Sequence, residues 1–85
     1  MNVRLRYFAR LREVFASGEE TPELPASIQT LAGLLDWLRQ RGGVWAEELA
    51  PGRAYRVAIN QDLADKDAVL RENDEIAIFP PVTGG

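Results

Sequence analysis

Apolar and polar residues alternate at both ends of the chain. In residues 2–8, valine, leucine and tyrosine take every second position, and arginines lie between them. The same period of two returns in residues 75–79, where isoleucines alternate with alanine and phenylalanine. Successive side chains of a strand point to opposite faces of a sheet, so both segments are predicted to be half-buried strands.

A helical period dominates the middle of the chain. Leucines and an isoleucine recur at spacings of three and four in residues 28–41, as on the buried face of an amphipathic helix. Ser27 is predicted to cap the start of this helix and Gly42 to end it. A shorter helical pattern follows the first strand and ends near Gly18.

The remaining elements are short. Residues 55–60 are predicted to form a strand, residues 63–64 a brief return strand and residues 44–49 a short helix. Residues 21–25 contain two prolines and are therefore predicted to be an edge strand. This order predicts an α+β fold of ubiquitin-like, β-grasp type, in which a mixed sheet carries one main helix on one face. Residues 1–85 are expected to form a single domain.

The amino-acid composition argues against most kinds of catalysis by side chains. The 85 residues include no cysteine and no histidine, and the two serines lie outside any nucleophile-elbow motif, so we expect no enzyme active site. The spacing of Asp62, Asp65 and Asp67 fits a solvated acidic turn, and no metal site is expected. A net charge of -3 argues against a nucleic-acid partner. No signal peptide or membrane-spanning run is evident, which favours a cytoplasmic protein with no membrane partner.

The chain ends in two glycines that closely follow two prolines. Proline favours extended backbone, so residues 80–85 are expected to form an extended, flexible C-terminal tail that reaches about 20 Å. Glycine has no Cβ, so Gly84 and Gly85 form the narrowest possible end. Such a tail can enter a slot in another protein and present its α-carboxylate there.

Residues 73–85, NDEIAIFPPVTGG, strongly resemble the C-terminus of the small, sulfur-carrying subunits of molybdopterin synthase. The segment FPPVTGG is specific to that family, whereas a bare Gly-Gly is not. Phe8-Ala9 with Arg12-Glu13, and residues 57–61, resemble the same family, so the similarity covers nearly the whole chain. Asn73 stands where many relatives have glycine, a change that keeps the same turn geometry.

This resemblance implies a carrier cycle. An E1-like adenylating enzyme uses ATP and Mg²⁺ to activate the carboxylate of Gly85, and sulfur then replaces AMP to give a thiocarboxylate. The chain itself binds no cofactor. The large catalytic subunit takes up the tail, and the sulfur passes to cyclic pyranopterin monophosphate. The inserted residues are Pro80, Pro81, Val82, Thr83 and Gly84.

The resemblance also implies partners and an interface. The large subunit is expected in a heterotetramer of two small and two large subunits, and the sulfur donor is a protein such as a cysteine desulfurase or rhodanese. Strict alternation places several apolar side chains on the sheet face opposite the main helix, and the family uses this face for docking. The expected interface residues are Phe8, Leu63, Ala77 and Phe79.

Three alternatives remain open from the residues. The chain could carry sulfur for another pathway, such as tRNA thiolation or thiamine or cysteine synthesis. It could be a ubiquitin-like modifier that forms isopeptide bonds with lysines of target proteins. It could also be a plain binding module with an inert tail.

Overall fold

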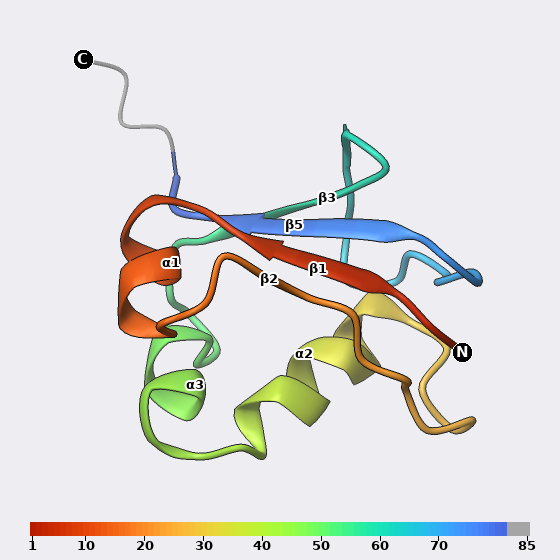
Figure 1. Cartoon of the computed structure of the whole chain (residues 1–85), viewed down its shortest axis with the longest axis horizontal. Coiled ribbons are helices and arrows are strands. Elements are labelled where there is room, and N and C mark those ends of the chain that lie inside the picture. Colours follow the sequence, from red (N-terminus) through yellow and green to blue (C-terminus); the bar gives the residue numbers. More distant parts are fainter. Residues whose placement is uncertain (82–85) are drawn as a thin grey trace.

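A five-stranded mixed sheet covered on one side by helices forms the body of the protein. The computed structural model describes residues 1–81. The strands lie in the order β2-β1-β5-β3-β4, and all three helices lie on the same side of the sheet (Figure 1). The elements are β1 (Arg4–Tyr7), α1 (Ala9–Val14), β2 (Glu19–Glu20), α2 (Leu31–Arg39), α3 (Gly43–Glu48), β3 (Arg56–Ile59), β4 (Asp62–Leu63) and β5 (Glu75–Phe79).

The two strands with the clearest alternation pair with each other at the centre of the sheet. β1 and β5 run parallel, with Leu5 beside Ile76 and Tyr7 beside Ile78. β3 pairs antiparallel with β5 on its other side, and β2 and β4 form short antiparallel edges. The predicted mixed sheet and its first and last strands are therefore confirmed.

The core lies between this sheet and α2. Four leucines of α2 are buried, at the spacing that predicted the helix. They belong to one cluster with the inward side chains of the central strands, which are at most 1% exposed. This set comprises Leu31, Leu34, Leu35 and Leu38 of α2, Leu5 and Tyr7 of β1, and Ile76 and Ile78 of β5.

The predicted limits of the main helix are wrong at both ends. The cap is Thr30, whose hydroxyl accepts a hydrogen bond from the N–H of Gly33 at 3.2 Å. Ser27 does not cap it because the intervening backbone pairs with residues 68–70 instead: Thr30 forms a β-bridge with Val69. At the other end the helix stops at Arg39, and Gly42, at a φ of 77°, is the N-cap position of α3.

The predicted edge strand is also displaced. β2 comprises Glu19 and Glu20, which pair with Arg6 and Leu5. The predicted segment 21–25 contributes only an isolated bridge from Glu23 to Asn2. Proline has no N–H to donate, so the prolines of this segment prevent a continuous ladder.

A polar network ties β1, β2 and the end of α2 together. The Tyr7 hydroxyl donates to Glu20 at 2.7 Å, and Arg41 donates to both oxygens of the same carboxylate at 2.8 and 2.9 Å. The Arg41 guanidinium lies 4.5 Å from the ring centre of Trp45, which stacks on Phe15. Burial raises the pKa of Tyr7, and the hydrogen bonds from Arg41 hold the pKa of Glu20 below its usual value.

Acid is therefore expected to weaken the fold through Glu20. A carboxyl whose pKa is lowered by folding stabilises the protein above its unfolded pKa, about 4.3, and loses that contribution as the pH falls through the folded pKa. Between pH 6 and pH 3 the free energy of unfolding should fall by about 1 kcal/mol more in the wild type than in Glu20→Gln. Urea titrations at both pH values measure this difference. Glu23→Gln, at an exposed site, should lose as much as the wild type.

Candidate functional site

One row of side chains crosses the sheet on the face that no helix covers. Ala77 of β5 lies beside Arg6 of β1 and Ala58 of β3, and Ala58 in turn lies beside Leu63 of β4. Side chains paired across neighbouring strands share a face. Because the isoleucines of β5 face the core, this row faces away from it.

Two phenylalanines lie one step further along the same face. Phe79 of β5 is half-buried and pairs with Arg56 of β3. Phe8 follows β1, donates its N–H to the carbonyl of Ile78 at 3.2 Å and is 38% exposed. We call Phe8, Ala58, Leu63, Ala77 and Phe79 the outer patch.

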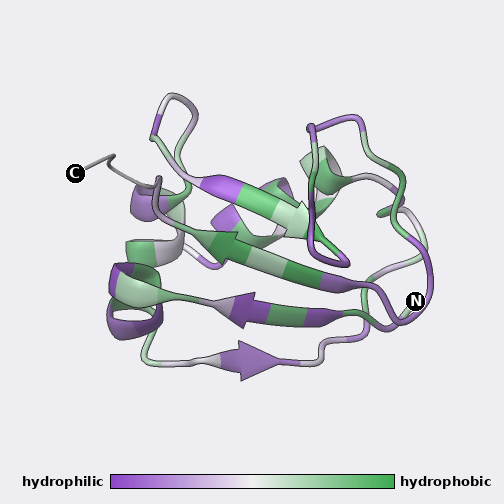
Figure 2. Cartoon of the chain, turned by 90° about the horizontal axis from the view of Figure 1, so that it is seen from above, coloured by the Kyte–Doolittle hydropathy of each residue, from purple (hydrophilic) through white to green (hydrophobic). Residues whose placement is uncertain are grey.

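Alternation along the strands correctly places Phe8, Ala77 and Phe79 on the outer face, and the β3–β4 pairing adds Leu63. Ala58 was missed, although it alternates with Val57 and could have been found in the same way. It is 8% exposed, yet it lies outside the core cluster. Figure 2 shows that the ribbons of β5 and β3 are mainly hydrophobic, whereas β2 is hydrophilic.

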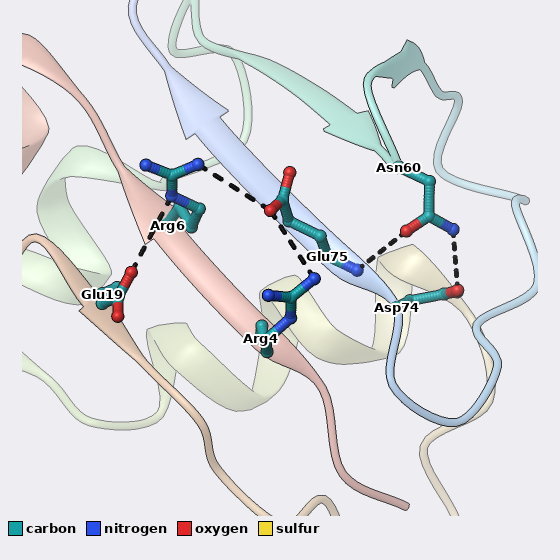
Figure 3. Close-up of polar contacts among 6 residues, drawn as sticks. All are labelled: Arg4, Arg6, Glu19, Asn60, Asp74 and Glu75. Atoms are coloured by element: carbon teal, nitrogen blue, oxygen red, sulfur yellow. Dashed lines mark hydrogen bonds and ion pairs between the residues drawn. The ribbon is translucent and has the colours of Figure 1, made fainter.

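Charged side chains border the outer patch on its β1 side. One carboxylate oxygen of Glu75 lies 3.8 Å from a guanidinium nitrogen of Arg4 and 3.8 Å from one of Arg6 (Figure 3). Arg6 also lies 3.9 Å from Glu19 and 5.2 Å from the ring centre of Phe8. The two cations and two carboxylates balance, so this border adds no strong net charge to the patch.

A buried carboxylate locks the end of β3 to the start of β5. The side-chain amide of Asn60 donates to Asp74 at 2.9 Å, and its oxygen accepts from the N–H of Glu75 at 3.0 Å (Figure 3). Asp74 is 7% exposed and also accepts from the N–H of Arg71 at 2.8 Å. Asn60 has a φ of 51°, which asparagine tolerates better than most residues. This clamp fixes the register under the outer patch.

Removing the Asn60 amide is expected to destabilise the protein by about 1 kcal/mol, because the buried Asp74 carboxylate loses a donor and the more exposed Glu75 N–H loses its acceptor. Asn60→Gly is the informative variant, since glycine accepts the positive φ without strain. Gln61→Gly, at the neighbouring position with a φ of 74°, controls for the added backbone freedom. Equal urea midpoints for the two variants would contradict the role assigned to the clamp.

The base of the tail lies at the end of β5. Pro80 and Pro81 are half-buried and are the last residues that the structure describes. The predicted tail residues Val82, Thr83, Gly84 and Gly85 lie outside the described residues. Their roles stay predictions.

An ion-pair cluster around the buried Glu48, next to the tail base, was not found from the sequence. Glu48 is 8% exposed and accepts two hydrogen bonds from Arg10, at 3.0 and 3.1 Å, and one from Arg53 at 3.4 Å. Both arginines line a cavity of about 180 Å³ that Pro80 and Pro81 also line. The cluster therefore connects α1, α3 and the loop before β3 at the point where the tail leaves the body.

Comparison with known proteins gives consistent results. The ThiS family matches residues 5–85. The chain is 39% identical to the molybdopterin synthase sulfur carrier subunit of Haemophilus influenzae, over 93% of this chain and 94% of that protein. No helix within residues 1–81 is long and apolar enough to cross a membrane.

Solved structures share the fold over the full length. SAMP1 of Haloferax volcanii, small archaeal modifier protein 1, is 26% identical, with a TM-score of 0.73 over the whole of both chains. A complex of subunits 1 and 2 of the molybdopterin-converting factor of Helicobacter pylori contains a chain that is 26% identical, with a TM-score of 0.70, again over both whole chains. The ubiquitin-like β-grasp fold is thus confirmed.

Proposed function

The chain belongs to the ThiS family, and on this basis we propose that it is the sulfur carrier subunit of a molybdopterin synthase. The observation that supports this most directly is the similarity to a sulfur carrier subunit over nearly all of both chains. The FPPVTGG segment of residues 79–85 supports the same assignment.

The reacting group in this proposal is the α-carboxylate of Gly85. Its ordinary pKa near 3.5 makes it an anion at neutral pH and a poor electrophile. Attack of the carboxylate on the α-phosphate of ATP releases diphosphate and gives an acyl adenylate. The terminal sulfur of a persulfide on the donor protein then attacks the acyl carbon, the bond to the phosphate oxygen breaks, and AMP leaves. A thiol attacks the donor-side sulfur of the acyl disulfide so formed, which leaves the donor in a disulfide and releases a thiocarboxylate. The resulting thiocarboxylate delivers its sulfur to cyclic pyranopterin monophosphate.

The chain's own contribution is recognition. Residues 1–81 bring the outer patch and the tail base together at one end of β5, so that a protein docked on the patch lies close to the tail. The adenylating enzyme, with its ATP and Mg²⁺, and the large subunit would supply the side chains that perform the chemistry. The sulfur donor, a protein such as a cysteine desulfurase or rhodanese, and the heterotetrameric assembly belong to the same proposal.

Reconstitution tests the proposed function. The thiocarboxylated chain is mixed with a large synthase subunit and cyclic pyranopterin monophosphate, and formation of the dithiolene product is measured. Two carrier chains should be consumed for each product, because the dithiolene contains two sulfurs. The same chain with an ordinary carboxylate is the matched control. Product formed equally from both forms would contradict the proposal.

The similarity to SAMP1 supports a second candidate, a protein modifier. Intact mass separates the two candidates. A gain of about 16 Da, sulfur in place of oxygen at an activated acyl group, indicates a carrier, whereas high-mass conjugates indicate a modifier.

A further inference from the structure

A half-open groove of about 770 Å³ lies beside the base of the tail. Leu31, Leu35 and Arg39 of α2 line it, and most of its other lining residues lie in the segments 50–57 and 63–66. Pro81 also lines this groove, so the groove reaches the point where the described chain ends.

The groove is cationic on an acidic protein. Four cations line it, Arg39, Arg53, Arg56 and Lys66, against one carboxylate, Asp65. The whole chain has ten cations and thirteen acidic residues. The charge around the tail base is therefore opposite in sign to that of the molecule, and it would attract an acidic group.

Two of these cations are bonded to other groups of the protein, and the other two are exposed with no carboxylate of the described residues nearby. Arg39 donates to the carbonyl of Leu49 at 2.7 Å and to the carboxylate of Asp36 at 3.0 Å. Arg53 is paired with the buried Glu48. Arg56 and Lys66 are exposed, and within residues 1–81 neither has a carboxylate within 4.0 Å. A partner carboxylate would thus meet charges that no internal ion pair has neutralised.

We propose that this groove binds an acidic segment of the large synthase subunit, an inference that rests on the proposed function. Any protein that encloses the residues after Pro81 must approach the groove, because Pro81 lines it. Leu63 lines the groove and also belongs to the outer patch, so the two surfaces are continuous around the β4 edge. The large subunit is favoured because a relative's solved complex joins subunits 1 and 2.

Charge reversal in the groove tests this inference. Exposed charges at the border of an interface act mainly on the association rate. Lys66→Glu and Arg56→Glu should each lower the rate of association with the large subunit about tenfold at 50 mM NaCl, and Lys66→Gln should have an intermediate effect. The effect should largely disappear at 500 mM NaCl, where screening is strong.

Arg71→Glu is the matched control, since it makes the same change of charge at an exposed site in the turn before β5, away from the groove. It should associate like the wild type, and all variants should keep the wild-type urea midpoint. Equal rates for Lys66→Glu and Arg71→Glu would overturn the inference and leave the proposed function intact. A loss seen only with the adenylating enzyme would also overturn it. Failure of the wild type itself to bind the large subunit would count against the proposed function.

Discussion

Adding one residue after Gly85, or replacing Gly85 with leucine, is expected to abolish adenylation of the chain. The acyl carbon must reach the α-phosphate of ATP inside the adenylating enzyme, and displacement of a reacting group by about 1 Å already costs on the order of 100-fold in rate. An added residue moves the carboxylate by more than 3 Å. ATP–diphosphate exchange in the presence of the adenylating enzyme measures this step directly.

Two controls separate this effect from loss of folding. Gly85→Ala adds a single methyl group and should retain more exchange activity than Gly85→Leu. Both variants should unfold at the wild-type urea concentration, because all residues of the core cluster described within residues 1–81 are unchanged in them. Exchange at the wild-type rate by the extended chain would refute the role of the terminal carboxylate.

Replacing Phe79 with aspartate is expected to weaken binding to the large subunit about 100-fold. Phe79 lies between Phe8 and Arg56, two positions along β5 from Ala77. An aromatic side chain that becomes fully buried in an interface commonly dominates the binding energy. An aspartate there would have to bury its charge without a partner. Titration calorimetry with the large subunit gives the dissociation constant.

Val69→Asp is the matched control for this prediction. Val69 is a 63%-exposed apolar residue whose backbone bridges to Thr30 at the start of α2, on the helix side of the molecule. The control should bind like the wild type, and Phe79→Asp should lower the free energy of unfolding by less than about 1 kcal/mol. An unchanged dissociation constant for Phe79→Asp would remove the outer patch from the interface.

Segments with a strong hydrophobic period were predicted well. β1, β5 and the leucine-rich face of α2 follow directly from periods of two and 3.6, because burial on one side forces those periods on the sequence. The outer patch follows from the same alternation. The family resemblance adds the chemistry predicted for the C-terminal carboxylate, which no hydrophobic period could indicate.

Features that depend on distant partners could not be predicted. Thr30, not Ser27, caps α2 because residues 28–30 pair with a segment about forty positions later in the chain. No local sequence pattern indicates that pairing. The cluster of Arg10, Glu48 and Arg53 likewise joins three separate elements, so its members share no spacing. The groove is also lined by residues from separate segments, so no local sequence pattern predicts it.

The parallel pairing of β1 with β5 also constrains how the protein is made. The strand in the middle of the sheet is the last to be synthesised, and its neighbour is the first. A nascent chain that has not reached Phe79 therefore lacks the central strand of the sheet. Until β5 is present, the leucines of α2 cannot pack against a complete sheet. Such a pairing closes a loop of nearly the whole chain, which slows folding. Refolding should consequently be slower than that of proteins of similar size whose contacts are mostly local.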